Sequence, residues 1–429
     1  MRICFIADSS SVHTQRIVSH SVRKGDEILL LSTSPYESAI LGTNTIHLLD
    51  DSKPAFTTAY EDRKQQTGFK ARIKSFVPVS AKLLLIWINR AVCLLSKRRF
   101  CAEEIRRFDP DVIYCFRSFP EGVLASYCHL RPLLLRTAGP DISKFPKYPV
   151  ISRFIRKALQ TADVIITESN WEKELLRRLC GPMLTAEVTI IGVDTVLFKP
   201  PTSRDRLREN YDLPRDAFVV VTNRSLEGHY NGWLIVEAVE FLLEQCPNLV
   251  LFYASPSRMG YQAKRRASAI TANCPRIRFL DRRVSHDEVP DILGCADLYV
   301  SLSSYDGIPN SVLEAMACGV VPIVAELPQL HEWIEHGETG YFVQQRDVKG
   351  LASLVHSLYN NREALPTIAK HCVAQIRKHG LYEECMDRTR ALLAQLANPM
   401  SSRNDERLVS SPLTTSFPCT TPGKSRLKF

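Results

Sequence analysis

Short apolar runs alternate with amphipathic segments along the first half of the chain. The run Ile3–Ala7 is followed by helical spacing near Thr14–Arg23 and by a second run, Glu27–Ser32. The further predicted strands of this half are Asp111–Phe116, Leu133–Arg136, Asp163–Thr167 and Glu187–Ile191. Apolar runs separated by amphipathic helices are typical of βαβ units, whose helices cover both faces of a parallel sheet. We therefore predict an α/β fold.

The same alternation starts again after the polar stretch Pro200–Arg215. Its predicted strands are Phe218–Asn223, Leu249–Ala254, Ile277–Leu280, Leu298–Ser301 and Val321–Val324. Two Rossmann-like, doubly wound halves are therefore expected to meet near residues 198–216. Ligands of such sheets bind beyond the carboxyl ends of the strands, so the cleft between the halves is the expected site.

These patterns predict an amino-terminal domain at residues 1–199 and a carboxy-terminal domain at residues 200–364. A helical segment at about 365–397 is expected to pack back on the first domain. Residues 398–429 are rich in Ser, Thr and Pro without a sustained apolar period, which predicts a disordered tail. A length of 429 residues agrees with two domains.

Charge and cysteine usage exclude some classes of protein. The net charge is +9, of which residues 398–429, with five Lys or Arg against two acids, carry +3. The remaining +6 is a mild excess that does not indicate a nucleic-acid-binding surface. The thirteen cysteines are scattered singly, with no CxxC pair and no Cys/His cluster at zinc spacing, which fits a reducing cytosol. Asp8 ends the first apolar run, so we expect no signal peptide, and we expect no membrane-spanning helix.

One region departs from the alternation. Residues 70–100 are apolar in the middle and basic at both ends. One interpretation is a helix packed on the core, with solvated Lys and Arg. The other is an amphipathic surface for anionic lipid headgroups, with Trp87 at the interface. Its basic residues would be Lys74, Lys82, Arg90 and Arg98. Both interpretations stay open.

The stretch SYDGIPNSVLEAMACG, residues 304–319, joins a loop to a predicted helix. Turn residues occupy its first half, and strong helix formers follow. A helix N-terminus attracts anions such as a diphosphate. Two carboxylates, Asp306 and Glu314, could accept hydroxyl groups of a sugar and of a ribose on either side of that diphosphate. The alternative is a helix capped by Asn310 or Ser311, with Glu314 exposed.

The longer segment SSYDGIPNSVLEAMACGVVPIVAELPQLHEWIEHGETGYFV, residues 303–343, resembles the carboxy-terminal signature of retaining glycosyltransferases of the GT-B fold, glycosyltransferase family 4 (group 1). In that signature an acid is followed by seven residues, a glutamate and then Ala-Met-Ala-x-Gly. The segment IIGVDTVLFKP, Ile190–Pro200, resembles the interdomain segment of the same family. The resemblance implies two Rossmann-like domains facing a cleft, the first binding the acceptor and the second the nucleotide sugar.

The resemblance also implies a role for each matching residue. Glu314 would bind the ribose of the donor nucleotide, and Asp306 the hydroxyls of the transferred sugar. Arg224 falls at the family's arginine after the first strand of the second domain, where its guanidinium would neutralise the departing diphosphate. Such an arginine is otherwise an ordinary surface ion-pair partner. These three are the expected catalytic residues. The expected donor-binding residues are Gly307, Ile308, Pro309, Asn310 and Ser311.

The chain departs from the family at the phosphate site. The family pairs its arginine with a lysine some six residues later, whereas His229, Tyr230 and Asn231 occupy this region here. The motif acid is Asp306 where glutamate is more common, and aspartate is one methylene shorter. We therefore expect diphosphate stabilisation to rest more on Arg224 and the loop to come closer to the sugar.

The amino-terminal half departs as well. Many members carry a histidine in a sugar-contacting loop, where this chain has Ala138 before Gly139. The first strand-to-helix loop, often glycine-rich, is ADSSSVHT. The acceptor-side candidates are therefore His13, Ser11, Arg117 and Asp141. His13 either faces the cleft and contacts a substrate or fills the first turn of the following helix, and both interpretations stay open.

The resemblance implies an enzyme that moves a hexose-type sugar from a nucleoside-diphosphate sugar to a hydroxyl acceptor with retention of configuration. The basic region 70–100 favours a lipid-linked glycan or cell-surface polysaccharide precursor as acceptor, met at the cytoplasmic face of the membrane. The alternatives are a GT-B nucleotide-sugar epimerase or hydrolase, and a catalytically weakened GT-B binding protein.

We expect no cofactor and no metal, since the nucleotide sugar is a substrate. The letters DPD at 109–111 resemble a metal-binding signature, but the proline places them at a helix-to-strand turn. The expected partners are the nucleotide-sugar donor, a glycan or glycolipid acceptor and an anionic membrane surface, without nucleic acid.

Overall fold

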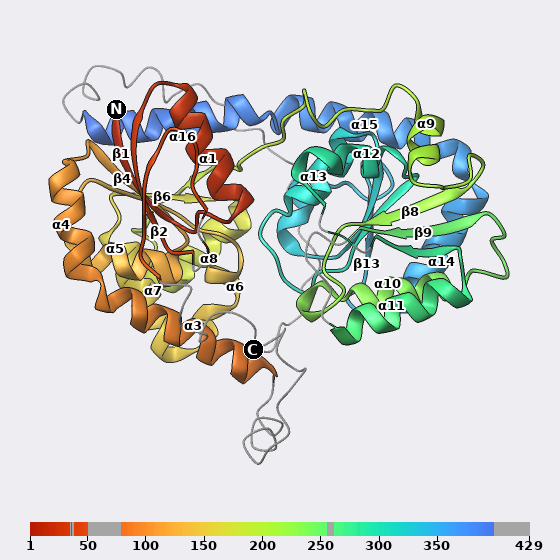
Figure 1. Cartoon of the computed structure of the whole chain (residues 1–429), viewed down its shortest axis with the longest axis horizontal. Coiled ribbons are helices and arrows are strands. Elements are labelled where there is room, and N and C mark those ends of the chain that lie inside the picture. Colours follow the sequence, from red (N-terminus) through yellow and green to blue (C-terminus); the bar gives the residue numbers. More distant parts are fainter. Residues whose placement is uncertain are drawn as a thin grey trace, which may run out of the picture.

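The computed structural model describes residues 1–34, 36, 38–49, 79–254, 261–280, 282 and 284–398, with the backbone alone for 79–84 and 261. Residues 399–429 of the predicted tail and residues 70–78 of the basic region lie outside the described residues. Two parallel sheets lie side by side, each covered by helices (Figure 1). The predicted α/β fold with two doubly wound halves is confirmed.

The first sheet has seven parallel strands in the order β3-β2-β1-β4-β5-β6-β7. The strands are β1 Arg2–Ala7, β2 Glu27–Ser32, β3 Asn44–His47, β4 Val112–Phe116, β5 Leu133–Arg136, β6 Val164–Thr167 and β7 Glu187–Val188. In β1 every residue from Ile3 to Ala7 is buried, because the sheet is covered on both faces. The sequence pattern missed β3, whose four residues, NTIH, contain a single strongly apolar side chain.

The helices of this domain follow the strands in alternation. They are α1 Val12–Arg23, α3 Val79–Ser96, α4 Arg98–Phe108, α5 Val123–Cys128, α6 Pro140–Ser143, α7 Pro149–Thr161 and α8 Asn170–Cys180. Because α1 follows β1 and α8 follows β6, both helices start at the carboxyl edge of the sheet. Ser169 caps α8 by accepting a hydrogen bond from the backbone amide of Glu172 at 3.1 Å.

The second sheet has six parallel strands in the order β10-β9-β8-β11-β12-β13. The strands are β8 Phe218–Thr222, β9 Leu249–Tyr253, β10 Ile277–Phe279, β11 Leu298–Ser301, β12 Val321–Ala325 and β13 Tyr341–Val343. The helices are α9 Arg204–Asn210, α10 Gly232–Glu240, α11 Tyr261–Asn273, α12 Val289–Gly294, α13 Asn310–Ala317 and α14 Val348–Asn360. Strand order reverses between β8 and β11 here, and between β1 and β4 in the first sheet. Such switch points are where doubly wound sheets bind ligands.

Two final helices, α15 Leu365–His379 and α16 Tyr382–Ala397, connect the halves along one side of the molecule (Figure 1). α15 packs on α13 and β12 of the second half, whereas α16 packs on α1, β4 and β5 of the first. Between them the chain passes the interdomain segment. The Val193 amide donates to the Gly380 carbonyl at 2.7 Å, and the Tyr382 amide donates to the Val193 carbonyl at 3.0 Å. The two chain crossings between the domains are therefore hydrogen-bonded to each other.

Candidate active site

A cavity of about 810 Å³ lies between the two halves. Its amino-terminal wall comes from α1, α3 and the segments after β4, β5 and β6. Its carboxy-terminal wall comes from the segments after β8, β10 and β11 and from the starts of α12 and α13. The cavity therefore lies at the carboxyl ends of the strands that flank both switch points, as the fold predicts.

Arg224, just after β8, and Asp306, in the loop after β11, form an ion pair inside this cavity. The other terminal nitrogen of Arg224 donates to the hydroxyl of Ser311 at 3.0 Å, and its guanidinium lies 4.3 Å from the ring centre of Tyr230. Burial raises the pKa of Asp306, and the adjacent guanidinium opposes that shift. Burial lowers the pKa of Arg224, but the Asp306 carboxylate and three neighbouring tyrosines together outweigh it, and the pKa is raised above its ordinary value. The expected catalytic arginine and aspartate are thus direct partners.

Glu314 lies on α13, where its residue is 6% exposed. Burial raises the pKa of its carboxyl to about 7, with Arg16 and Arg224 opposing the shift. α13 has no side-chain cap among the described residues, because Pro309 occupies the N-cap position and Ser311 instead accepts from Arg224. The alternative of a capped helix with an exposed Glu314 is therefore wrong.

The loop before α13 approaches the amino-terminal half closely. A Cβ at Gly139 would lie 2.2 Å from the Gly307 amide nitrogen, so the two backbones touch across the cavity. The amide of Ile308 donates to a carboxylate oxygen of Glu168 at 3.3 Å. Gln329 supports the loop from behind by donating to the Asp306 carbonyl at 2.8 Å. All five expected donor-binding residues, Gly307, Ile308, Pro309, Asn310 and Ser311, line the cavity.

The acceptor-side candidates are only partly gathered in the cavity. His13 lines it, and its Nδ1 lies 3.0 Å from the side-chain amide nitrogen Nδ2 of Asn310 in the other half, so the histidine contacts more than the first turn of its own helix. Burial, together with the nearby Arg16, lowers the pKa of His13 to about 3, so the ring is neutral. Arg117 and Asp141 also line the cavity, whereas Ser11 is not among its lining residues.

Asp141 has a structural role. Its two carboxylate oxygens accept from the amide of Ser118 at 2.6 Å and from the amide of Ala138 at 2.9 Å. These contacts hold together the segments after β4 and β5, both of which line the cavity. Asp141 therefore positions the amino-terminal wall of the cavity. The guanidinium of Arg117 lies in the same wall, 5.8 Å from the ring centre of Phe116.

The sequence reasoning missed Glu168 and Glu172, at the carboxyl end of β6. Glu168 lines the cavity, and burial raises its pKa to about 7, with Arg136 opposing. Glu172 lies behind it and accepts from the Glu168 amide at 3.1 Å. Burial raises the pKa of Glu172 well above its ordinary value, and the nearby Glu168 adds to the shift. The signal was present, since an acid directly follows a predicted strand in a doubly wound sheet.

The described part of region 70–100 bears on its two interpretations, a helix packed on the core and a surface for lipid headgroups. Trp87 lines the cavity and lies 5.5 Å, centre to centre, from Phe145. Arg90 forms ion pairs at 3.3 Å with Asp8 and with the fully buried Glu121. For Trp87 and Arg90 the structure agrees with the first interpretation, a helix packed on the core, because both side chains face the domain. The side chains of Lys74 and Lys82 lie outside the described residues.

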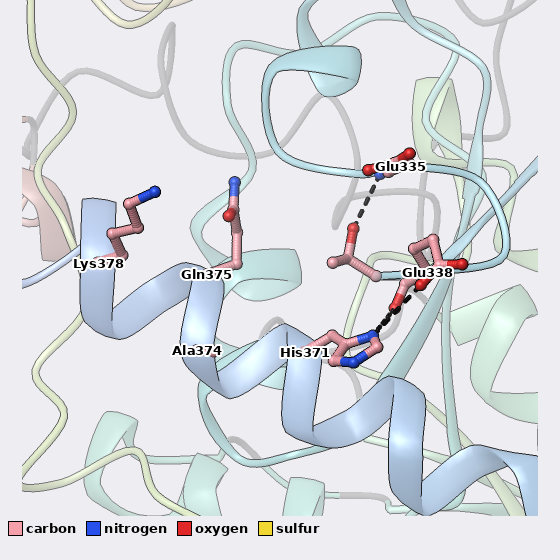
Figure 2. A pocket seen from close by; sticks show the side chains of 7 residues that line it. Glu335, Glu338, His371, Ala374, Gln375 and Lys378 are labelled. Carbon is pink, nitrogen blue, oxygen red and sulfur yellow. Dashed lines mark hydrogen bonds and ion pairs between the residues drawn. The ribbon is translucent and has the colours of Figure 1, made fainter. Parts of the chain in front are cut away.

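A second recess, of about 430 Å³, lies between the loop 335–339 and α15 (Figure 2). Figure 2 shows His371 of α15 pointing at Glu338, whose carbonyl and carboxylate oxygens lie 3.2 and 3.4 Å from its Nδ1. These contacts join the loop to the helix. No predicted site residue within the described part of the chain lines this recess. The interdomain cavity remains the candidate site.

The described structure also bears on metal sites and on helices that could cross a membrane. Across the described residues, no group of three or more His, Cys, Asp and Glu side chains is arranged to hold a metal ion. None of the helices within the described ranges is long and apolar enough to cross a membrane.

Comparison with known proteins connects this geometry to a family. A family model described as Glycosyl transferases group 1 matches residues 221–361. EpsD of Bacillus subtilis is 28% identical over 267 residues, 62% of this chain and 65% of that protein. A GDP-mannose-dependent alpha-(1-6)-phosphatidylinositol monomannoside mannosyltransferase of Mycolicibacterium smegmatis is 26% identical over 296 residues, 67% of this chain and 74% of that protein. The matched part spans about two thirds of the first of these relatives.

Solved structures share the whole architecture. A sucrose-phosphate synthase from Thermosynechococcus elongatus superposes with a TM-score of 0.70 at 16% identity, covering 92% of this chain and 99% of that one. Anabaena HepE in complex with UDP-glucose gives a TM-score of 0.66 at 18% identity, covering 92% of this chain and all of that one. At these identities the likeness shows the fold. Residues 221–361, which contain Arg224, Asp306 and Glu314, are therefore similar to the group 1 glycosyltransferases, and the whole chain has the two-domain GT-B fold.

Proposed function

We propose that this protein transfers a sugar from a nucleoside-diphosphate sugar to a hydroxyl acceptor, with retention of anomeric configuration. The observation that carries the proposal is the convergence of Arg224, Asp306 and Glu314 in one cavity between the two sheets. The cation, the backbone amides and the two carboxylates of this cavity each suit one part of the donor. Arg224 and the amides suit the diphosphate, Glu314 suits the ribose hydroxyls and Asp306 suits the transferred sugar.

The Arg224–Asp306 ion pair supports a simple exchange of partners on donor binding. A diphosphate oxygen that pairs with the guanidinium replaces the Asp306 carboxylate, which is then free to accept hydroxyls of the sugar. In the transfer step the acceptor oxygen bonds to the anomeric carbon on the face from which the diphosphate leaves. The carbon–oxygen bond to the diphosphate breaks, its electron pair goes to the diphosphate oxygen, and that oxygen takes the acceptor proton. Arg224 stabilises the charge that develops there, without a metal ion.

We infer that the acceptor is a glycan or glycolipid used in polysaccharide or glycolipid assembly. The amino-terminal wall presents Trp87, Phe119 and Phe145, and aromatic rings stack on the apolar faces of sugars and pack against lipid chains. Two relatives are named for lipid-linked substrates. One is the phosphatidylinositol monomannoside mannosyltransferase, and the other is an Escherichia coli galactosyltransferase named for a diphosphoundecaprenol substrate.

The same inference places the protein on the cytoplasmic face of a membrane. α3 exposes Leu85 and Val92, each 60% exposed, and Ile88, 38% exposed. This spacing puts the three side chains on one helical face, opposite the buried Leu94. Arg98 and Arg99 are exposed at the start of α4, directly after α3, and Arg98 donates to the Leu95 carbonyl at 3.3 Å, so positive charge lies near the end of α3, as an anionic headgroup layer would favour.

One observation favours a second candidate, a nucleotide-sugar hydrolase or epimerase. These reactions need an acid–base group beside the sugar, and Glu168 places a carboxyl with a pKa of about 7 in the cavity wall. In hydrolysis, water would bond to the anomeric carbon, the diphosphate would leave with the bonding electron pair, and Glu168 would take the water proton.

Product analysis tests the proposal against this candidate. The protein is incubated with radiolabelled UDP-glucose, UDP-galactose, UDP-N-acetylglucosamine or GDP-mannose, with and without a bacterial lipid extract. Label that moves into the lipid or glycan fraction only when extract is present supports transfer. Free labelled sugar or an altered nucleotide sugar without extract supports the second candidate, and nucleotide binding without any product indicates a binding protein.

A further inference from the structure

We propose that Arg16, in the amino-terminal domain, is a second diphosphate-binding cation that serves in place of the lysine expected after Arg224. The inference rests on the proposed function and adds a residue that lies outside the matched family region, residues 221–361.

The segment after Arg224 supplies no cation of its own. Burial, together with Arg224, lowers the pKa of His229 to about 4, so its ring is neutral. Tyr230 packs under the guanidinium of Arg224, and the amide of Asn231 donates to the Leu302 carbonyl at 2.7 Å. A nucleoside diphosphate bound here would therefore meet a single guanidinium from the carboxy-terminal half.

Arg16 reaches the cavity from the opposite half in a held orientation. Its side chain is 11% exposed, and its Nη2 donates to the Gly192 carbonyl at 2.6 Å. Its guanidinium lies 4.9 Å from the ring centre of Tyr382, whose hydroxyl donates to the Arg16 carbonyl at 2.6 Å. The interdomain segment and the start of α16 thus fix one end and one face of the guanidinium.

The other end of the guanidinium is available to a ligand. Nη1 of Arg16 is buried and has no hydrogen-bond partner among the described residues. The nearest carboxylate oxygen, Oε1 of Glu314, lies at 3.9 Å, beyond hydrogen-bond distance. A buried donor on a charged group costs free energy unless something accepts its hydrogen bond. Both Arg16 and Glu314 line the interdomain cavity.

The chemistry of the missing partner follows from these neighbours. The group must accept hydrogen bonds and carry negative charge, and it must lie beside the carboxyl proposed to hold the ribose. The phosphate groups of a nucleoside diphosphate meet all three conditions, since they are attached to that ribose. With Arg16 on one wall and Arg224 on the other, the diphosphate would be neutralised by both halves. Donor binding would then draw the two domains together.

A purely structural role makes a different prediction. If Arg16 served only to pair with Glu314 across the cleft, its loss would weaken the binding of nucleosides and of nucleoside diphosphates equally. A phosphate contact weakens only the binding of the nucleotides that carry phosphate. Comparing the two ligands therefore separates the roles.

The experiment uses calorimetric titration of the full chain with UDP and GDP, and with uridine and guanosine. Variants are Arg16→Gln, the charge-conserving Arg16→Lys, and the control Arg23→Gln. Arg23 lies on the same helix and 5.7 Å from the same Tyr382 ring, but it pairs with the surface residue Glu383 and does not line the cavity. Thermal unfolding of each variant checks that it is folded.

Arg16→Gln is expected to weaken the binding of the preferred nucleoside diphosphate by about 10- to 100-fold, the value of a charge-assisted hydrogen bond, and to leave nucleoside binding unchanged. The affinity of Arg16→Lys for the nucleoside diphosphate should lie between those of the wild type and of Arg16→Gln. Arg23→Gln should bind it like the wild type. Equal binding by wild type and Arg16→Gln, or an equal loss for nucleoside and diphosphate, would overturn the assignment. A wild-type protein that binds neither UDP nor GDP would contradict the proposed function itself, along with the role of Arg16.

Discussion

The guanidinium of Arg224 and the carboxylate of Asp306 form an ion pair that joins the end of β8 to the loop after β11. Both side chains are largely buried in the cavity wall, 14% and 19% exposed, so each depends on the other for charge neutralisation. A donor that brings a negative diphosphate and a set of sugar hydroxyls provides new partners for both. The pair is therefore the part of the site whose contacts change most when the proposed donor binds.

Replacing Arg224 tests this exchange. Arg224→Gln removes the cation that stabilises the leaving diphosphate, so kcat/KM for sugar transfer is expected to fall by about 100- to 1000-fold. Arg131→Gln is the matched control, because Arg131 forms an exposed ion pair with Asp163 at 2.9 Å, outside the cavity. Steady-state kinetics with the preferred donor measure both variants. A folded Arg224→Gln enzyme with wild-type kcat/KM would show that this arginine does not act on the diphosphate.

The raised pKa of Glu314 predicts how stability depends on pH. Its carboxyl has a pKa of about 7 in the folded chain, against an ordinary value of 4.5, so the folded state holds this proton more tightly than the unfolded state. This contribution to the free energy of unfolding is present below about pH 4.5 and is lost as the pH rises toward 7.

Glu314→Gln removes this titration. Between pH 5 and pH 8 the free energy of unfolding of the wild type should fall by about 2–3 kcal/mol more than that of the variant. Urea unfolding of both proteins at the two pH values measures the difference. Parallel pH profiles would mean that Glu314 titrates normally and is not buried as described.

The contact between Gly139 and Gly307 predicts a glycine requirement for function. Gly139 has a φ of +53°, and a Cβ there would lie 2.2 Å from the Gly307 nitrogen, so Gly139→Ala should keep the two halves apart. Gly25→Ala is a matched control, because Gly25 also has a positive φ, +78°, but nothing lies within 4 Å of its Cβ position.

Both substitutions place an alanine at a positive φ and so cost stability, and the cost is expected to be larger at Gly139, whose ψ of −85° lies outside the left-handed helical region. Gly139→Ala alone is expected to lower transfer activity, by about tenfold or more, because a small misplacement of the reacting groups is costly. Activity assays and small-angle scattering of both variants check this expectation. Equal activities in the two variants would argue against a functional contact at this point.

The exposed face of α3 predicts membrane binding. Replacing Leu85, Ile88 and Val92 with serine should abolish flotation with vesicles that contain phosphatidylglycerol. Val150, Met183 and Val196, which are 70%, 92% and 81% exposed elsewhere on the protein, provide a control triple substitution of equal kind. If both triple variants float like the wild type, α3 is not the lipid-binding surface.

Much of the fold follows from local patterns. The runs that became β1, β2, β5 and β11 are continuous and strongly apolar, because strands buried on both faces require it. The edge strand β3 was missed because it is only four residues long and partly buried, so its sequence carries no apolar run.

The candidate site was predicted less completely, for a physical reason. Motif spacing brought out Arg224, Asp306 and Glu314, since all three lie in the matched carboxy-terminal half. It gave no sign that Arg224 and Asp306 pair, or that Arg16 approaches Glu314, because these contacts join positions 82 and 298 residues apart. The sequence left open whether Arg90 faces lipid or the core; it lies among Asp8, Thr33 and Glu121, where its charge offsets that of a buried carboxylate.

The most direct test of the account is the rate of sugar transfer by Glu314→Ala, measured with the preferred labelled donor and acceptor beside the wild type. Glu314 is the carboxyl proposed to hold the ribose, so its loss is expected to abolish measurable transfer and to weaken donor binding, in a variant whose thermal unfolding shows that it is folded. Full transfer activity with unchanged donor affinity would contradict the proposed donor site.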